Sequence, residues 1–388
     1  MPGRSVNRFS RPFLLNCLKP FVTFRFISNT HVFSSLSHIR IAGLAVSTGS
    51  VTRDFIADGL ALGLARAQLE RVSQTIGLKE RKVAAAGITT LDLCEDAARR
   101  LLDEMGIDAS AIDAVIFVTQ TPDHSQPNNS SLLHGRLGLS KSAAAFDLAM
   151  GCSGWVYGLH QAALLCAHGG AARVLLCAGD TLSRLTNPLD RATDPLFGDA
   201  GSTALIEKTG HAPAMHFNLE ADGSGAKSIC VPAGGARLPA TPLTKQEIKD
   251  AEGNIHHAEN LHINGSDVFN FTLREVPGSV ASVLKMAGWT PAQADTLILH
   301  QANRFMVSTI GKKCGFAPEK TPMDSVETFG NQSSASIPCA LIHALGVPLQ
   351  EKTLKVVACG YGVGLSWGSV ALELGPLVVA PLQSFPKL

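Results

Sequence analysis

The fold class is decided by the stretch Thr90-Leu91-Asp92-Leu93-Cys94-Glu95-Asp96-Ala97-Ala98-Arg99-Arg100-Leu101-Leu102 and by the run Ala114-Val115-Ile116-Phe117-Val118 that follows it. The first stretch spaces its apolar residues three and four positions apart, which predicts an amphipathic helix over 90–105. The second run is short, apolar and rich in β-branched residues, which predicts a buried strand. A helix followed by a buried strand is the unit of an α/β fold.

The same unit returns later in the chain. Residues 269–287 carry apolar side chains at helical spacing, Gly288 and Pro291 end that helix, and Thr296-Leu297-Ile298-Leu299 has the pattern of a strand. Two matched elements in the same order favour a duplicated α/β unit. We therefore expect a first half over 38–211 and a second half over 212–388.

The segment 220–261 departs from this plan. It is rich in Gly, Pro, Lys and Asp and shows little periodicity, so we expect a long surface insertion that helps to cover a pocket. The histidines at 256, 257 and 262 lack the spacing that fixes a tetrahedral ligand set. We predict no metal site.

Composition excludes several classes of protein. Of the 388 residues, 45% are hydrophobic and 17% are charged, which excludes intrinsic disorder and a disulfide-stapled miniprotein. Thirty-three Lys and Arg against 32 Asp and Glu leave a net charge of +1, so no bulk field attracts nucleic acid or an anionic membrane. Nine cysteines form no Cys-x-x-Cys pair, a pattern that favours the reducing cytoplasm.

The N-terminal segment differs in charge from the rest of the chain. Residues 1–53 contain seven Arg or Lys and no acidic residue. The apolar stretch 12–22 is interrupted by Lys19 and two prolines and is too short to cross a bilayer, and no later segment predicts a membrane span. A disordered tail, translation from an upstream start codon and, less favoured, an organelle transit peptide remain open. We place residues 1–37 outside the fold as a basic leader.

Cys152 is a candidate nucleophile. It lies in Asp147-Leu148-Ala149-Met150-Gly151-Cys152-Ser153-Gly154-Trp155, at a turn that leads into a predicted helix. A thiol at a helix N-terminus is close to free backbone N–H groups and the positive end of the helix dipole, which lower its pKa. A buried structural cysteine is an equal alternative at this stage, and it is the interpretation we adopt for Cys166 and Cys177.

Two further groups of residues point to ligand binding in the second half. His300 directly follows a predicted strand, at the edge where α/β proteins place ligand-binding groups. A lone histidine is more often structural, but Asn331 lies on a turn that opens into a helix of small residues and can donate to a carbonyl. The glycine-rich loop 360–368 leads into another strand rather than a helix, which favours an oxyanion over a nucleotide.

Together these features resemble the thiolase-fold condensing enzymes and, among them, the β-ketoacyl-ACP synthase III family. The resemblance extends from Ile39 to the C-terminus through motifs in the family's order: Gly77-Leu78-Lys79-Glu80-Arg81, the Cys152 turn, Asp190-Arg191, Phe197-Gly198-Asp199, His300-Gln301-Ala302-Asn303, Gly330-Asn331 and Gly364-Leu365-Ser366-Trp367-Gly368. It implies a thiolase-like α/β fold in which two duplicated halves form a five-layer αβαβα sandwich, and it implies a homodimer.

The resemblance also implies a Cys-His-Asn triad of Cys152, His300 and Asn331. An acyl group would pass from a CoA or ACP thioester to Cys152, and malonyl-ACP would then lose CO₂ and condense with it to give a 3-oxoacyl-ACP, as in fatty acid biosynthesis. The backbone N–H groups of Cys152 and Gly364 would form the oxyanion hole. Acyl carrier protein is the implied partner, and no cofactor is implied.

Two sets of binding residues follow from the same resemblance. The family's CoA contacts fall on Arg71, Thr75 and Arg191, where Arg71 replaces a stacking tryptophan and Thr75 replaces an arginine. Docking of the carrier protein falls on the basic residues Arg304, Lys312 and Lys313, for which a solvated charged face is the alternative. Because of these replacements, the sequence does not identify the acyl group that primes the reaction or its carrier.

Two other functions remain open. A thiolase-fold acyltransferase would use Cys152 to move an acyl group onto an alcohol or amine without decarboxylation, and it would not need both His300 and Asn331. A non-catalytic dimer partner would not need an intact triad. Release of CO₂ from a malonyl thioester distinguishes the condensing enzyme from both.

Overall fold

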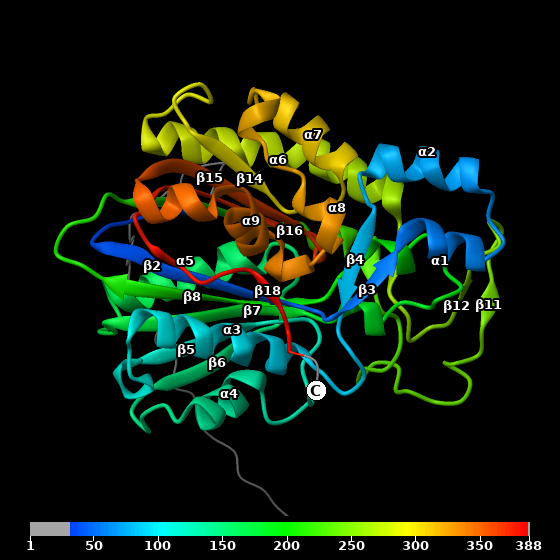
Figure 1. Cartoon of the computed structure of the whole chain (residues 1–388), viewed down its shortest axis with the longest axis horizontal. Helices are drawn as coiled ribbons and strands as arrows, with labels where there is room; N and C mark the ends of the chain where they lie inside the picture. The colour runs from blue at the N-terminus through cyan, green and yellow to red at the C-terminus, as the bar shows by residue number, and fades with distance from the viewer. Residues whose placement is uncertain (1–31, 387–388) are drawn as a thin grey trace, which may run out of the picture. The chain divides into compact units, whose positions relative to one another are not determined.

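The chain folds into two large sheets and three layers of helices, which stack as five layers (Figure 1). The computed structural model describes residues 32–386, and the part of the predicted leader before residue 32 lies outside them. The layer order is helix, sheet, helix, sheet, helix, which confirms the predicted thiolase-like sandwich. No helix within the described residues has the length and apolar character needed to cross a membrane.

The larger sheet belongs mainly to the first half. Its strand order is β17-β2-β8-β7-β5-β6, and β18 also pairs with β2. β2 is antiparallel to β8 and β8 to β7, whereas β7, β5 and β6 are parallel. The strands are β2 (Ile39–Thr48), β5 (Ala114–Val118), β6 (Ala144–Leu148), β7 (Arg173–Asp180), β8 (Ala200–Lys208), β17 (Val378–Val379) and β18 (Gln383–Ser384).

The smaller sheet has the order β1-β9-β16-β15-β14. Its strands are β1 (Val32–Leu36), β9 (Met215–Ala221), β14 (Thr296–Leu299), β15 (Leu354–Gly362) and β16 (Ser366–Leu374). β9, β16 and β15 are successively antiparallel and β15 is parallel to β14, so this sheet repeats the order and sense of β2, β8, β7 and β5. The repeated topology supports the proposed duplication.

Each end of the described chain adds a strand to the sheet of the other half. β1 pairs with β9 of the smaller sheet, and the C-terminal strands β17 and β18 pair with β2 of the larger one. The expectation that everything before residue 38 lies outside the fold is therefore wrong for 32–37. An edge strand of five residues, Val-Phe-Ser-Ser-Leu, in which polar and apolar side chains do not alternate, gave too weak a pattern to be recognised.

The helices occupy three of the five layers. α3 and α4 cover the outer face of the larger sheet, α5 and α9 lie between the sheets, and α6 and α7 cover the outer face of the smaller sheet. Their bounds are α3 (Thr90–Met105), α4 (Asn129–Leu137), α5 (Gly154–Ala167), α6 (Gly265–Ala287), α7 (Arg304–Lys313) and α9 (Ser336–Glu351). α3 and β5 have the bounds predicted from the sequence.

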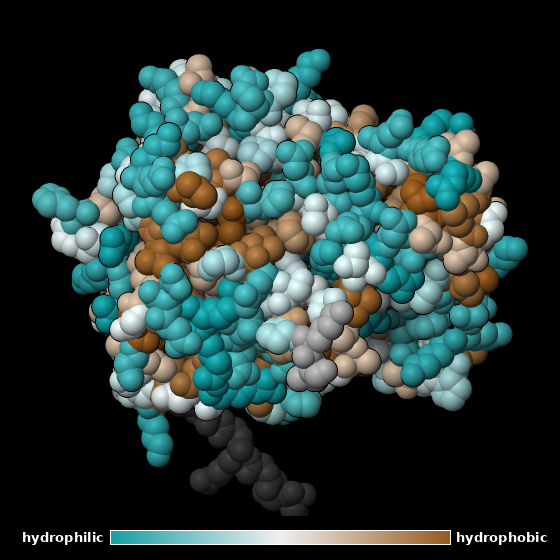
Figure 2. Space-filling view, in the orientation of Figure 1, coloured by the Kyte–Doolittle hydropathy of each residue, from teal (hydrophilic) through white to brown (hydrophobic). Residues whose placement is uncertain are grey.

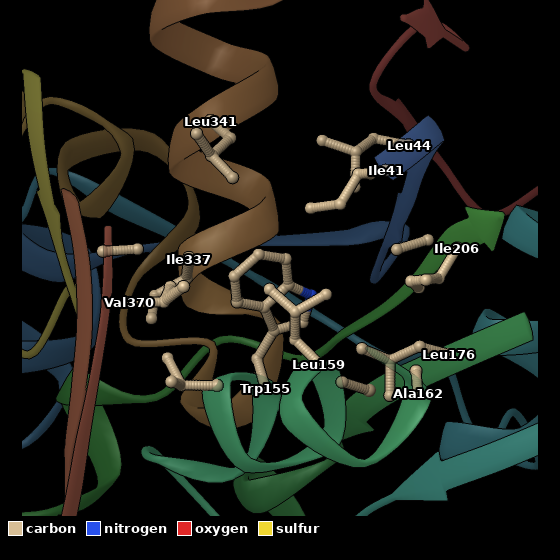
Figure 3. Close-up of a cluster of buried hydrophobic side chains, with 14 of the residues drawn as sticks. Ile41, Leu44, Trp155, Leu159, Ala162, Leu176, Ile206, Ile337, Leu341 and Val370 are labelled. Carbon is tan, nitrogen blue, oxygen red and sulfur yellow. The ribbon is translucent and has the colours of Figure 1, made fainter. Parts of the chain in front are cut away.

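The central layer contains the largest part of the core (Figure 3). Trp155 and Leu159 of α5 face Ile337 and Leu341 of α9, and all four side chains are buried. A helix covered by sheets on both sides must be apolar over most of its surface, which explains the composition of both helices. The active-site candidates Cys152 and Asn331 each lie shortly before one of these two immobilised helices.

The remaining elements lie beside the sandwich. They are β3 (Val51–Asp54), α1 (Phe55–Ala61), α2 (Arg66–Ile76), β4 (Glu80–Val83), α8 (Ser325–Phe329) and the strands of the insertion, β10 (Ile229–Cys230), β11 (Ile248–Lys249), β12 (Ile255–His256) and β13 (His262–Ile263). Figure 2 shows hydrophobic surface over α1 and α2. Leu60 of α1 and Val72 of α2 have exposed side chains.

Candidate active site

One cavity of about 310 Å³ brings the three predicted catalytic side chains together. Cys152 reaches it from the turn before α5, His300 from the end of β14, and Asn331 from the segment between α8 and α9. The cavity walls are otherwise largely apolar and include Leu182, Leu196, Phe197, Ile229, Leu261, Ile263, Val268, Phe269, Phe305 and Met306. Ile229 and Leu261 come from the insertion, which therefore covers a pocket as predicted.

Glycines allow the backbone to approach the thiol closely. A Cβ atom at Gly362 would lie 2.8 Å from Cβ and 2.9 Å from Sγ of Cys152, and a Cβ atom at Gly151 would lie 2.3 Å from Nε2 of Gln120. A larger residue at Gly362 would therefore displace the Cys152 side chain, and one at Gly151 would displace the end of the Gln120 side chain. The glycine-rich loop after β15 thus packs directly against the Cys152 turn.

The Cys152 thiol is held in its protonated form at pH 7. Burial raises the pKa of Cys152 to about 11, and the charge of Asp180 acts in the same direction. Contacts with the Ser333 hydroxyl, 3.9 Å from Sγ, and with the backbone of Val363 and of Cys152 itself oppose this shift. The expectation that the helix N-terminus lowers the pKa of this thiol is wrong, because desolvation outweighs it.

His300 is held in a fixed orientation. Its Nδ1 lies 2.6 Å from the Ser336 hydroxyl in the first turn of α9, and the Tyr361 hydroxyl donates to its carbonyl at 3.0 Å. Burial lowers the pKa of His300 to about 3, with the backbone of Ser333 opposing, so the ring is neutral at pH 7. If the Ser336 hydroxyl donates to Nδ1, the proton of the ring is on Nε2.

The Asn331 amide is oriented by its own turn. Its Oδ1 accepts from the Ser333 N–H at 3.0 Å, and its backbone N–H donates to the Leu196 carbonyl at 2.8 Å. Gly330 has φ of 75°, and a Cβ atom there would lie 3.0 Å from the Leu196 carbonyl oxygen. With Oδ1 engaged, the Nδ2 group is the part of the amide available to a ligand.

The oxyanion hole of Cys152 and Gly364 stays a prediction, and backbone donors lie close to the thiol at Cys152 and at the residue before Gly364. Backbone N–H groups of Cys152 and of Val363 lie beside the thiol. Val363 precedes the predicted Gly364, and the cavity is lined by Gly362 and Val363. The glycine-rich loop therefore presents a donor to the thiol, and the role of Gly364 itself stays a prediction.

Comparison with known proteins identifies the family. The 3-oxoacyl-[acyl-carrier-protein (ACP)] synthase III model matches residues 146–223, and the model of the C-terminal part of the same synthases matches 284–374. The chain is 36% identical over 307 residues to a beta-ketoacyl-[acyl-carrier-protein] synthase III of Symbiobacterium thermophilum, which covers 79% of this chain and 90% of that one. This chain belongs to the 3-oxoacyl-ACP synthase III family.

Other members of this synthase III family match with similar coverage. A beta-ketoacyl-[acyl-carrier-protein] synthase III of Rhodopirellula baltica is 31% identical over 354 residues, which is 86% of this chain and 98% of that one. The crystal structure of a 3-oxoacyl-(acyl-carrier protein) synthase from Burkholderia xenovorans superimposes with a TM-score of 0.85 at 35% identity and covers 92% of this chain and 99% of that one. The resemblance inferred from the motifs is confirmed.

The CoA contacts predicted from the synthase III resemblance do not line one pocket. Arg191 lines a second cavity, of about 480 Å³, between the α1–α2 region and the insertion. Its guanidinium donates to the Glu252 carbonyl at 2.5 Å and to Asn254 Oδ1 at 3.3 Å. Arg71 and Thr75 are exposed on α2, outside the lining of that cavity. Their role in CoA binding stays a prediction.

The predicted docking residues lie at different ends of α7. Arg304, at its first residue, forms ion pairs with Glu327 and, at 3.9 Å, with Asp324. Lys312 and Lys313 are exposed at the opposite end of the helix, and Lys313 Nζ donates to the Leu273 carbonyl at 2.7 Å. The first turn of α7 contributes Phe305 and Met306 to the cavity wall instead. Arg304 is thus largely neutralised by its neighbours.

Several polar residues of the site were not predicted from the sequence. Gln120 lines the cavity and donates from Nε2 to the Ser333 hydroxyl at 3.0 Å, and Ser336 contacts His300. Asp180 underlies the same region. The only available signal was the serine-rich run at 333–336, which we interpreted as a helix start. Within residues 32–386, no group of three or more His, Cys, Asp or Glu side chains is arranged to hold a metal.

Proposed function

We propose that this chain catalyses the synthase III reaction: transfer of an acyl group from a thioester to Cys152, followed by decarboxylative condensation with malonyl-ACP to give a 3-oxoacyl-ACP. The observation that supports this most strongly is the convergence of Cys152, His300 and Asn331 on one largely apolar cavity. The membership of the chain in the family supports it independently.

In the first half-reaction, Cys152 attacks the carbonyl carbon of the bound thioester. The carbon–sulfur bond of the donor breaks, a carbon–sulfur bond to Sγ forms, and the thiol proton leaves with the departing thiolate. Because burial holds the pKa of Cys152 near 11, the thiol is protonated in the free enzyme. The N–H groups of Cys152 and of the Val363–Gly364 segment would hold the negative charge that develops on the carbonyl oxygen.

In the second half-reaction, His300 and Asn331 hold the malonyl thioester. Loss of CO₂ breaks the carbon–carbon bond and moves its electron pair toward the thioester oxygen, where an enolate forms. The neutral His300 ring can donate from Nε2 and the Asn331 amide from Nδ2, and neither donor needs to change protonation state. The enolate carbon then attacks the acyl carbon, collapse of the tetrahedral species expels the Cys152 thiolate, and the thiolate takes up a proton from water to restore the thiol.

A homodimer is part of the same proposal. β6 ends the order of the larger sheet, and in the described part of the chain only β5 pairs with it. Its side chains from Ala145 to Leu148 are half-buried. An unpaired edge strand is a template for another strand, and a second copy of β6 running antiparallel would continue the sheet under twofold symmetry. Sedimentation at micromolar concentration should give a dimer, and a monomer would contradict this part.

Acyl carrier protein and CoA or ACP thioesters are the proposed partners, with no cofactor beyond these substrates. The cytoplasmic location stays a prediction, supported by the eight cysteines in the described residues, all of which are free thiols.

The proposal is tested by mass spectrometry of products. The purified chain is incubated with a panel of acyl-CoAs and acyl-ACPs, and malonyl-ACP is added afterwards. We expect an acyl adduct on the protein with at least one donor and a 3-oxoacyl-ACP extended by two carbons after the addition. Discharge of the adduct by an alcohol or amine, with no release of CO₂, would establish acyl transfer instead.

A further inference from the structure

Asp180 is a buried carboxyl group with an unusual set of partners. It is the last residue of β7 and is 0% exposed. Its Oδ1 accepts from the Gln120 N–H at 2.7 Å and from the Thr119 hydroxyl at 3.2 Å. Its Oδ2 accepts from the hydroxyl of Ser334 at 2.8 Å and from the N–H of Ser334 at 3.2 Å. Among the ion pairs of the described residues, none includes Asp180.

These contacts join the two halves of the active site. Thr119 and Gln120 follow β5 in the first half, and Ser334 lies three residues after Asn331 in the second. Between them, Ser333 has φ of 48°, in the left-handed region, and its N–H donates to Asn331 Oδ1. Such a conformation is unfavourable for serine and persists when its surroundings impose it. The carboxylate of Asp180 and the amide of Gln120 hold this turn from the first half, together with the backbone of Leu196 and Gly198, which bonds to Asn331.

The contact pattern identifies the form of the carboxyl group. Each oxygen of Asp180 accepts two of these four hydrogen bonds, which suits an ionised carboxylate. Burial raises the pKa of Asp180, and its hydrogen bonds with Gln120, Ser333 and Ser334 oppose that shift by favouring the charged form. An asparagine at this position would point its NH₂ group at two of the groups that donate to Asp180, so these hydrogen bonds would be lost.

We propose that Asp180 is a positioning residue that fixes the Asn331 turn and the Gln120 segment against the Cys152 thiol. It touches neither the thiol nor the cavity, and it acts through Ser334 on the one side and through Gln120 on the other. Its charge also acts on the thiol from a distance. The other titratable groups that face Cys152 are His300, after β14, and Tyr361, on β15, both of which are neutral at pH 7.

The first test measures the thiol itself and does not depend on the proposed reaction. The rate at which iodoacetamide alkylates Cys152 is followed against pH by intact mass in the full-length chain. The charge of Asp180 contributes to the raised pKa of Cys152, so Asp180→Asn should move the midpoint of this profile to lower pH. Alkylation at pH 7 should then be about tenfold faster. An unchanged profile would overturn the electrostatic part of the proposal.

Asp199 provides the matched control. It is also 0% exposed, and its carboxylate accepts from the Ala84 N–H at 2.8 Å and from the Ser183 hydroxyl. Asp199→Asn should lower the thermal midpoint about as much as Asp180→Asn but leave the alkylation profile where it is. If both variants shift the profile equally, Asp180 has only a general structural role.

The second test rests on the proposed function and separates its half-reactions. Asp180→Asn should reduce discharge of the acyl enzyme by malonyl-ACP at least tenfold more than it reduces acylation. Ser334→Ala removes one hydrogen-bond donor to Asp180 and keeps the charge of Asp180. It should therefore slow discharge of the acyl enzyme without moving the alkylation profile. This variant replaces Asp180→Asn in the test if Asp180→Asn does not fold. Equal losses in both half-reactions would overturn the positioning role. Absence of discharge by the wild-type chain would instead reject the proposed function.

Discussion

β5 in the first half and β14 in the second occupy equivalent places in their sheets, each parallel to the strand beside it. β14 is followed by His300, whereas β5 is followed by Thr119 and Gln120. The first half has an additional strand, β6, beyond β5, and the Cys152 turn follows that strand. One topology thus places His300, the proposed hydrogen-bond donor to the enolate, after β14 in one half, and the extra strand β6 places Cys152, the proposed nucleophile, in the other.

The two halves also share one electrostatic feature. Burial raises the pKa of Cys152 to about 11 and lowers the pKa of His300 to about 3, so both groups are neutral at pH 7. Asp180, at the end of β7, acts electrostatically on the Cys152 thiol. The proposed division between a nucleophile from the first half and enolate-binding donors from the second is the feature that mutations can test.

The largest expected effect comes from the first half. Cys152→Ala should abolish the acyl adduct and lower turnover by at least about 10³-fold, because no other group in the cavity can form the thioester. Intact-protein mass spectrometry measures the adduct directly. Cys230→Ala, at a half-buried thiol on β10, is the control and should acylate normally. An adduct that persists in Cys152→Ala would place the nucleophile elsewhere.

Removal of a second-half donor should affect only one step. His300→Ala and Asn331→Ala should each slow decarboxylation of malonyl-ACP by about 10²–10³-fold, which is the usual effect of losing one oxyanion donor. Acylation of Cys152 should change less than about threefold. Single-turnover rates for both steps provide the comparison, and a parallel loss of acylation would mean that the halves do not divide the chemistry.

A moderate effect is expected on stability in acid. The pKa of His300 is near 3 in the folded chain and near 6.5 when unfolded, so the unfolded state binds the additional proton between these values. The free energy of unfolding is therefore highest above pH 6.5 and decreases as the pH falls. At pH 4 the decrease is roughly 3 kcal/mol. Urea unfolding at pH 7 and at pH 4 measures this difference in the free energy of unfolding, and His300→Asn should remove it. Equal losses in the two proteins would argue against a buried neutral ring.

The smallest effect is expected at the surface of the second half. Because Lys312 and Lys313 are exposed and far along α7 from the cavity, replacing both with Ala should raise KM for malonyl-ACP by about threefold at low salt and less at high salt. Lys352→Ala, at another exposed lysine, is the control. A change in kcat instead of KM would show that this end of α7 acts on the chemistry rather than on docking.

The sequence predicted local elements better than the contacts between them. α3 and β5 have strong periodicity, and Gly106 in the left-handed conformation ends α3 where predicted. α6 begins four residues earlier than expected, because the Asn264 side chain caps a polar first turn that carries no apolar pattern. The short edge strand β1 was missed for the same lack of pattern.

The candidate site shows the same limit. Cys152, His300 and Asn331 were predictable because each lies in a recognisable motif. Asp180 and Ser336 were not, because their partners Ser334 and His300 are 154 and 36 positions away and only the packed halves bring them together. The direction of the pKa shift at Cys152 was missed for a related reason. A helix N-terminus is visible in the sequence, whereas desolvation by distant elements is not.

The division of labour between the halves is tested most directly by one chase experiment. Wild-type and Asn331→Ala proteins are acylated to completion, freed of donor and mixed with malonyl-ACP, and the mass of each protein is followed with time. We predict that the wild type loses its acyl adduct with release of CO₂, while Asn331→Ala is acylated equally but keeps the adduct at least about 100 times longer. Discharge of both proteins at the same rate would contradict the account.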